Sequence, residues 1–349
     1  MNFAGASRYV GNHPSFAGLA GSLVAVAMAG LTLLTLSSGR TDALNYSRDT
    51  SQNLVAIIST DLARNVEIYD LSLQAMVDGA KDPVAWTLPL DVRRAVLFDR
   101  STTAAYLGSA YVIGLTGEVV ASQRGDANPT VRFADRDYFL AHQQKPRSGL
   151  YFSHPFRSRL RDGKLSVGLS RRIDKADGTF NDVALLAIRM EYFQHLLDRI
   201  NTGKLGSVFI VMDDGTLLAR KPFSPRDIGT SIAKSPTYKV MASHESGSYE
   251  DEAISTVDGV RRMYTYAHVP GTPLIAAVAP SVDEVLAPWQ HCSRITGVLT
   301  LAFGAVFVIV SWLFAFVLRA QDALERLAAT DPLTGLNNRR VLDKRLDEE

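Results

Sequence analysis

The residues best suited to bind a ligand are arginines concentrated between Thr130 and Lys175. This stretch holds eleven basic and four acidic residues. A guanidinium group presents a planar fork of N–H donors that matches carboxylate and phosphate oxygens. A subset of these side chains could therefore form a pocket for a small anion. The alternative is a basic sheet face in contact with water, because charged runs usually stay exposed. The arginines are Arg132, Arg136, Arg147, Arg157, Arg159, Arg161, Arg171 and Arg172.

The sequence shows no spacing typical of an extracytoplasmic catalytic or metal site. His244-Glu245 is not followed by a second histidine at metalloprotease spacing. The seven histidines are scattered, and no glycine-rich phosphate loop ending in Lys-Ser or Lys-Thr occurs. The net charge of +1 argues against general nucleic-acid binding. We therefore expect no metal site, no hydrolase chemistry and no nucleic-acid partner.

The most specific motif lies in the last twenty residues. A D-x-L-T-G-L-x-N-R-R pattern begins at Asp331 and ends at Arg340, with all eight specified positions filled. This pattern resembles the opening of a GGDEF domain, the catalytic unit of diguanylate cyclases. The resemblance implies that the complete protein joins two GTP into cyclic di-GMP with Mg²⁺ or Mn²⁺. The carboxylates and signature loop of that family would lie beyond Glu349. We therefore expect this 349-residue form to be inactive, with no cofactor and no catalytic residue of its own.

Other outputs remain open from the sequence. The GGDEF domain could be degenerate, with a phosphodiesterase domain following it in the chain. The same external architecture also serves chemoreceptors and histidine kinases, although the motif at Asp331–Arg340 argues against both. The residues beyond Glu349 would decide between these alternatives.

Two uncharged apolar segments predict membrane spans. No Asp, Glu, Lys or Arg lies between Arg8 and Arg40, or between Arg294 and Arg319. As helices, both segments are long enough to cross a hydrocarbon core of about 30 Å. A cleaved signal peptide is the alternative for the first, but its apolar run exceeds the roughly 7–15 residues of such signals. Arg8, Arg319 and Arg326 place both ends in the cytoplasm by the positive-inside rule. We expect a two-pass inner-membrane protein with a periplasmic domain.

The predicted external domain begins with a long helix. Apolar residues recur at three- and four-residue steps over 45–80, with no Pro or Gly before Gly79. Such a helix could pack on its own domain or pair with a second copy, and we expect a homodimer. The only cysteine, Cys292, excludes a disulfide within one copy, so packing must hold the domain together. The apolar positions are Leu54, Ile58, Leu62, Val66, Tyr69, Leu73 and Met76.

A repeat comes after the helix. Residues 111–121 align with residues 209–219, 98 positions later, and each segment is a β-rich run, a glycine turn and a second β-rich run. Both segments predict hairpins. Further predicted strand pairs follow each hairpin in the sequence, so two lobes built on antiparallel sheets are expected.

The whole arrangement resembles the double Cache sensors, and the element Phe133–Phe139 resembles their D-R-x-Y-F element. The expected fold is α+β, with two PAS-like antiparallel-sheet lobes on a long N-terminal helix, flanked by two transmembrane helices. The expected segments are a cytoplasmic N-terminus (1–15), the first span (16–38), the sensor (39–293), the second span (294–318), a signalling helix (319–329) and the start of GGDEF (330–349). Within the sensor we expect the long helix at 45–80, the first lobe at about 81–190 and the second at about 191–287.

The resemblance also directs the ligand prediction. In these sensors the membrane-distal lobe, here the first, usually binds the ligand. One subset recognises amino groups through a pattern from which this chain departs, since Val131 and Arg189 replace the expected Tyr and Asp. We therefore expect a small-molecule ligand, a carboxylate, in the first lobe and not the second. An empty lobe controlled by a partner protein remains the alternative. The predicted ligand-binding residues are Arg136, Tyr138, Tyr111, Tyr151 and Arg172.

Overall fold

The structure is a computed structural model that describes residues 15–98, 107–125, 130–145, 149–160, 163–254 and 258–329. The chain divides into two compact units. One unit comprises Leu44–Val285 and is called the lobe unit below. The other comprises Met1–Ala43 with Leu286–Glu349 and is called the span unit. The motif at Asp331–Arg340 lies outside the described residues.

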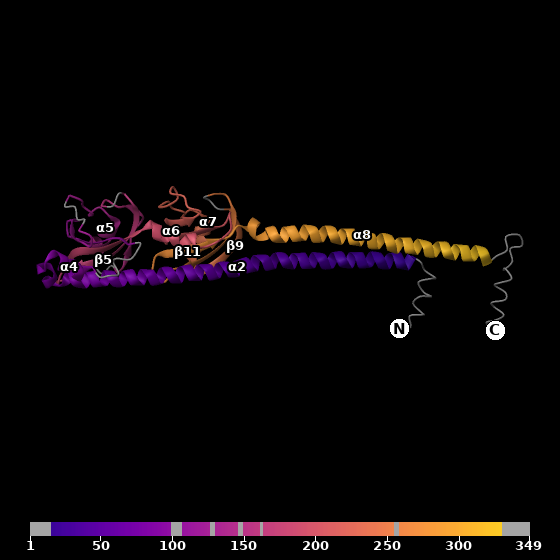
Figure 1. Cartoon of the computed structure of the whole chain (residues 1–349), viewed down its shortest axis with the longest axis horizontal. Coiled ribbons are helices and arrows are strands. Elements are labelled where there is room, and N and C mark those ends of the chain that lie inside the picture. Colours follow the sequence, from indigo (N-terminus) through magenta and orange to yellow (C-terminus); the bar gives the residue numbers. More distant parts are fainter. Residues whose placement is uncertain are drawn as a thin grey trace, which may run out of the picture. The chain divides into compact units, whose positions relative to one another are not determined.

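The lobe unit is built along the C-terminal part of helix α2 (Ser15–Lys81). The predicted apolar stripe of this helix is buried from Ile58 to Met76, with Leu62, Leu73 and Met76 fully enclosed, and Leu54 is partly buried. Burying such a side chain contributes about 1.5–3 kcal/mol of stability, so the stripe fixes this helix against both lobes. In Figure 1, α2 runs along the sheets of both lobes, and its buried residues share one core with them. Lys81 ends the helix, and Asp82 caps the next, short helix by accepting a hydrogen bond from the backbone N–H of Val84.

The first lobe holds a six-stranded sheet of order β2-β1-β6-β5-β3, with β4 also paired to β5. All its pairings are antiparallel. The elements are α3 (Pro83–Thr87), α4 (Leu90–Leu97), β1 (Leu107–Ile113), β2 (Val119–Ser122), α5 (Asp137–Gln144), β3 (Tyr151–Phe152), β4 (Phe156–Arg157), β5 (Leu165–Asp174) and β6 (Phe180–Arg189).

The second lobe holds a five-stranded antiparallel sheet of order β8-β7-β11-β10-β9. Helix α6 (Met190–Asp198) joins the lobes and buries Met190, Phe193 and Leu197 in the shared core. The other elements are β7 (Ser207–Met212), β8 (Leu217–Lys221), α7 (Pro236–Ser243), β9 (Ser246–Ile254), β10 (Arg261–His268) and β11 (Leu274–Ala279).

The two sheets share one topology, which confirms the predicted repeat. Each begins with a hairpin whose register shifts once, between Val112 and Ile113 in the first lobe and between Ile210 and Val211 in the second. These positions are 98 residues apart, the spacing seen in the sequence. The predicted α+β class with two antiparallel-sheet lobes on a long helix is confirmed.

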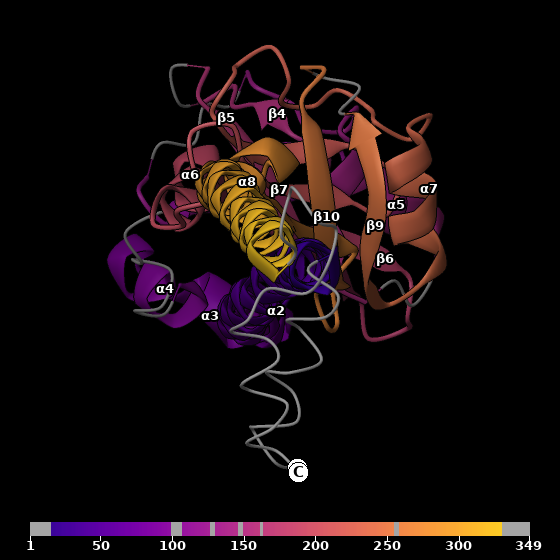
Figure 2. The ribbon, with the colours of Figure 1, turned by 90° about the vertical axis from the view of Figure 1, so that its right-hand side faces the viewer.

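Each sheet is covered on both faces. The central strands β1, β7 and β11 are buried at every position. One face of the second sheet packs against α2, whereas the other packs against α7, and Figure 2 shows these helices on different sides of β9 and β10. Helix α5 covers the corresponding face of the first sheet. The α5 and α7 faces are therefore equivalent places in the two lobes.

The span unit pairs the N-terminal part of α2 with helix α8 (Val282–Ala329) in antiparallel fashion. Both helices contain segments long and apolar enough to cross a membrane. The indole nitrogen of Trp289 donates to the carbonyl oxygen of Leu36 at 2.9 Å, and Thr32 and Thr300 hydroxyl oxygens lie 3.2 Å apart. A guanidinium nitrogen of Arg319 donates to the hydroxyl of Ser15 at 2.8 Å. Polar groups along the two helices thus hydrogen-bond to each other, and the Thr32–Thr300 pair lies within the apolar segments, where polar groups need such partners.

Candidate functional site

The D-R-x-Y-F element is positioned by the first hairpin. The backbone N–H of Phe133 donates to the carbonyl of Gly117 at 2.8 Å, and a Cβ at Gly117 would lie 2.4 Å from the backbone nitrogen of Ala134. Gly117 has φ of 84°, a conformation that glycine adopts without strain. Only glycine therefore allows this close approach. The chain then enters α5 at Asp137 and lays that helix across the sheet.

Three of the predicted site residues meet on the α5 face of the first sheet. Tyr111 from β1 and Tyr138 from α5 belong to one buried cluster, and the half-buried Tyr151 packs against it. The Tyr138 ring centroid lies 5.3 Å from that of Phe156, and the Tyr111 and Phe133 centroids are 6.3 Å apart. Aromatic pairs at such distances contribute roughly 0.5–1.5 kcal/mol beyond their burial. This face is thus filled largely by rings.

Two polar atoms in this aromatic cluster lack hydrogen-bond partners among the described residues. The Tyr138 hydroxyl is fully buried and unpaired, and so is Nε of Arg136. Burial raises the pKa of Tyr138, so the phenol keeps its proton and remains a donor. A buried polar group without a partner costs about 1–3 kcal/mol. The first lobe therefore holds two donors that a ligand or water would satisfy.

Arg136 stands at the edge of this cluster. Its guanidinium carbon lies 5.2 Å from the centroid of Phe156, and one terminal nitrogen donates to the carbonyl of Arg157 at 3.0 Å. The side chain is half-buried. The cation is therefore held over an aromatic face while part of its fork has no partner among the described residues, an arrangement that can receive an acceptor oxygen.

Arg172, the fifth predicted residue, is engaged elsewhere. It hydrogen-bonds the Asp174 carboxylate and the His142 carbonyl, and its guanidinium carbon lies 5.1 Å from the Phe180 centroid. Arg172 and Asp174 share one side of β5, as alternate strand residues do. The structure therefore places Arg172 in contacts that hold α5 to the sheet, and does not group it with Arg136.

Other arginines of the basic stretch form ion pairs. Arg159 makes two hydrogen bonds of 2.6 Å to Asp135, which lower the pKa of that carboxyl to about 2. Arg171 points to α2, where its guanidinium pairs with both oxygens of Asp70 at 2.5 and 2.8 Å. The stretch is therefore divided between two sheet faces, and much of its charge is neutralised within the protein.

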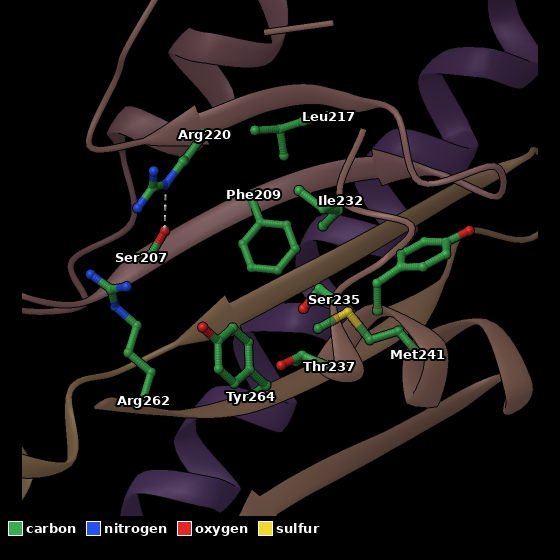
Figure 3. Close-up of a pocket in the computed structure, with 11 residues that line it drawn as sticks. Ser207, Phe209, Leu217, Arg220, Ile232, Ser235, Thr237, Met241, Arg262 and Tyr264 are labelled. Atoms are coloured by element: carbon green, nitrogen blue, oxygen red, sulfur yellow. Dashed lines mark hydrogen bonds between the residues drawn. The ribbon is translucent and has the colours of Figure 1, made fainter. Parts of the chain in front are cut away.

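The second lobe has an equivalent loop that sequence reasoning missed. The N–H of Ile232 donates to the carbonyl of Gly215 at 2.8 Å, as that of Phe133 does to Gly117. Thr237 lies five residues after Ile232, and Tyr138 lies five residues after Phe133, so the two residues are at equivalent positions. Thr237 lines a pocket, shown in Figure 3, whereas the larger Tyr138 is buried in the aromatic cluster of the first lobe. The 98-residue repeat was the sequence signal that could have located it.

Comparison with known proteins identifies the family of the lobe unit. Residues 38–289 match the dCache_1 family, described as a Cache domain. No curated protein sequence matches the chain.

Solved structures share the fold. The extracellular domain of rpHK1S-Z16, a protein assigned as a histidine kinase, aligns with a TM-score of 0.60 and 24% identity, over 70% of this chain and 99% of that one. The periplasmic sensory domain of the Campylobacter jejuni chemoreceptor Tlp1 aligns with a TM-score of 0.57 and 11% identity, over 70% and 99%. The ligand-binding domain of the Pseudomonas aeruginosa amino acid chemoreceptor PctB, in complex with L-Gln, gives 0.53 and 13%, over 68% and 93%. At these identities the likeness concerns the fold alone. Through residues 38–289 the chain belongs to the dCache_1 family, as the extracellular ligand-sensing Cache domain of a signal receptor.

Proposed function

We propose that the chain is the sensory and membrane-spanning part of a diguanylate cyclase, which converts two GTP to cyclic di-GMP. The observation that carries the proposal is the helix α8, which runs without interruption from Val282 to Ala329. The motif D-x-L-T-G-L-x-N-R-R comes directly after it, beginning at Asp331. A single helix thus links a Cache domain to a sequence that resembles the start of a GGDEF domain.

The proposed control is dimer geometry. Two GGDEF domains, each holding one GTP, must face each other to join the nucleotides. A displacement of α8 would change how the two domains meet. Among the described residues no group of three His, Cys, Asp or Glu could hold a metal ion. The Mg²⁺ or Mn²⁺ that such a reaction uses is therefore assigned to none of them.

A parallel homodimer is part of the proposal. The buried stripe of α2 leaves Ile57, Ile68 and Leu71 exposed on its remaining surface. These residues lie within one side of a helix, because eleven residues nearly complete three turns. A second copy of α2 would cover them. Both copies would lie in one inner membrane, with the lobes in the periplasm and both chain ends in the cytoplasm.

We further propose that the first lobe binds a small carboxylate at Arg136 and Tyr138. The unpaired Tyr138 hydroxyl and Arg136 Nε support a ligand with acceptor oxygens. Tyr111 and Tyr151 would line the site. The test is isothermal titration of the full chain in lipid nanodiscs with organic acids, amino acids and amines. Arg136→Ala should weaken carboxylate binding about ten- to a hundredfold.

The exposed Arg226 of the second lobe provides the charge-matched control, and Arg226→Ala should leave the affinity unchanged. Tyr138→Phe removes the hydroxyl with little change of volume and should also weaken binding. Binding of amines but not acids would contradict the carboxylate assignment. Equal binding by Arg136→Ala and the wild type would make Arg136 a structural residue.

A histidine kinase or chemoreceptor output is the second candidate, favoured by the solved structures of similar fold. The two candidate functions require different residues beyond Glu349. Sequencing the continuation of the gene and measuring cyclic di-GMP made by its purified product distinguishes them. An intact Gly-Gly-[Asp/Glu]-Glu-Phe loop with cyclase activity supports the first proposal. A phospho-acceptor histidine or a long heptad array would overturn it, and a broken loop succeeded by an E-x-L motif would indicate a phosphodiesterase.

A further inference from the structure

The second lobe contains a pocket on the α7 face of its sheet. The cavity volume is about 40 Å³, several times the roughly 10–15 Å³ that one water requires by this measure. We propose that this pocket is a second ligand site, which binds a short-chain monocarboxylate with its charged end toward Arg220 and Arg262. The lining residues are Ser207, Phe209, Leu217, Arg220, Ile232, Ser235, Thr237, Tyr238, Met241, Arg262 and Tyr264.

One end of the pocket is lined by two buried arginines. The side chains of Arg220 and Arg262 are only 7% and 3% exposed, yet both form part of the wall. Figure 3 shows them at the same end, with Ser207 between them. Both guanidinium groups pair with Asp258, and Arg220 also pairs with Asp227, but neither carboxylate lines the cavity. The two carboxylates balance the two positive charges, but because they do not line the cavity a molecule there meets guanidinium N–H donors and hydroxyls first, which favours a group with acceptor oxygens.

Hydrogen-bond donors without partners face the same space. Ser235 is the N-cap of α7, but its side chain makes no capping hydrogen bond. Ser235 and Thr237 are residues at least nine-tenths buried, and among the described residues neither hydroxyl makes a side-chain hydrogen bond. Figure 3 shows both among the pocket residues. Carboxylate oxygens would accept hydrogen bonds from both hydroxyls.

The other end of the pocket is apolar. Phe209, Leu217, Ile232 and Met241 come from β7, β8, the loop after β8 and α7. They belong to or pack against the hydrophobic cluster on this sheet face. A methyl or ethyl group placed against them would be removed from water, at about 0.8 kcal/mol for each buried methylene. A short aliphatic acid matches both ends, whereas an amine would oppose the two arginines and an amide would lack the charge.

The first lobe shows how the same place can be closed. Tyr138 occupies the position equivalent to Thr237. Its ring packs against Phe156, which in turn lies close to the sheet, 3.3 Å from where a Cβ on Gly168 of β5 would stand. The two lobes therefore keep one backbone plan, and the tyrosine and the threonine are one of the differences between the helices that cover the two sheets. The substitution Thr237→Tyr imitates an arrangement that this fold already accepts.

The experiment is isothermal titration of the full chain in lipid nanodiscs with acetate, propionate and butyrate at constant ionic strength. Propionamide and propylamine test the charge requirement. Thr237→Tyr should abolish the heat of binding, and Thr237→Val, which keeps the volume but removes the hydroxyl, should lower the affinity about tenfold or more. The exposed Thr87 on α3 provides the control, since Thr87→Val should change nothing.

The outcomes separate this site from the one proposed in the first lobe. Binding that survives Arg136→Ala and is lost in Thr237→Tyr assigns the carboxylate to the second lobe, whatever the first lobe binds. Equal binding of propionate, propionamide and propylamine would overturn the proposal, as would propionate affinity unchanged in both Thr237 variants. Should Thr237→Tyr fail to fold, Thr237→Val alone decides between these results. No heat with any of the three acids would also overturn it.

Discussion

Nε2 of His154 lies 2.6 Å from Oδ2 of Asp214, a contact that joins the two lobes. His154 comes after β3 in the first lobe, and Asp214 lies in the β7–β8 turn of the second. Nδ1 of His154 is also 3.1 Å from the carboxylate of Asp137, at the start of α5. A histidine donates from both ring nitrogens only when protonated. The imidazolium form therefore bridges both carboxylates.

This bridge should make the contact between the lobes depend on pH. Burial lowers the pKa of His154, but hydrogen bonds to Asp214 and Asp137 outweigh it, so the pKa lies above its ordinary value. The stabilisation is fully present below the unfolded pKa of about 6.5 and is lost as pH rises through the folded pKa. Because the His154 side chain is half exposed, the stabilisation from this bridge should be below about 1 kcal/mol. Thermal unfolding of the wild type and His154→Gln between pH 5.5 and 8.5 measures it. Parallel pH profiles for the two proteins would exclude the bridge as a contributor.

Gly117→Ala should destabilise the first lobe by more than conformational strain alone. A Cβ there would meet the backbone of Ala134, and φ of 84° adds the cost of a left-handed residue, about 1–2 kcal/mol. Gly178→Ala is the matched control, because Gly178 has φ of 79° but no atom within 4 Å of the added Cβ. Chemical unfolding followed by Trp86 fluorescence should show a loss at Gly117 at least about 1 kcal/mol larger. Equal losses would mean that the loop at Ala134 moves freely away.

The sequence was sufficient to predict the helices and the repeat because both depend on local patterns. The stripe from Ile58 to Met76 has helical spacing and is buried as predicted. The hairpins depend on glycines such as Gly117 and Gly215, whose positive φ a turn of this kind requires. The predicted membrane segments of α2 and α8 likewise derive from uninterrupted apolar composition.

The site depended on contacts that the sequence does not encode locally. The partner of Arg171 is Asp70, 101 residues away. The sequence of the basic stretch therefore could not show that Arg171 is engaged in an ion pair and is not available to a ligand. The pocket beside Thr237 is lined by side chains from β7, β8, β10, α7 and the loop before α7, which the sequence does not bring together locally. The loop before α7 is one residue longer than the loop before α5. Equivalent residues of the two helices are therefore 99 positions apart, and the 98-residue repeat of the hairpins does not align them. The ion pair of Arg172 could have been predicted from the sequence, because Asp174, two positions later, lies on the same side of the strand.

Asp182→Asn should stabilise the protein at neutral pH. Asp182 is 8% exposed, and burial together with the charge of Glu118 raises its pKa to about 6. An acid whose folded pKa exceeds its unfolded value of about 3.9 destabilises the fold once it ionises, so the penalty appears as pH rises from about 4 through 6. Removing the charge should gain about 1–3 kcal/mol at pH 8 and little at pH 4. Unfolding at both pH values tests this, and Asp177→Asn serves as the exposed control. A gain of the same size at both pH values would point to a cause other than ionisation.

His142 should contribute a pH dependence of the opposite sign in the same lobe. Its ring is fully buried on α5, with Nε2 2.9 Å from the hydroxyl of Ser170, and burial lowers its pKa to about 4. The unfolded chain takes up a proton below about pH 6.5 while the folded one does not, so stability is present above pH 6.5 and is lost as pH falls toward 4.

The loss at His142 should amount to about 2–3 kcal/mol between pH 7 and pH 4. His142→Gln, which stays neutral throughout, should be less stable than the wild type at pH 7 through altered packing but should lose less stability on acidification. Because Asp182 acts in an overlapping window with the reverse sign, the comparison is best made in the Asp182→Asn background, where the acid loss of His142 stands alone. Unfolding at pH 7, 5.5 and 4.5, followed by Trp86 fluorescence, measures the slope. If His142→Gln and its parent lose stability equally, the acid sensitivity of the first lobe arises from groups other than this histidine.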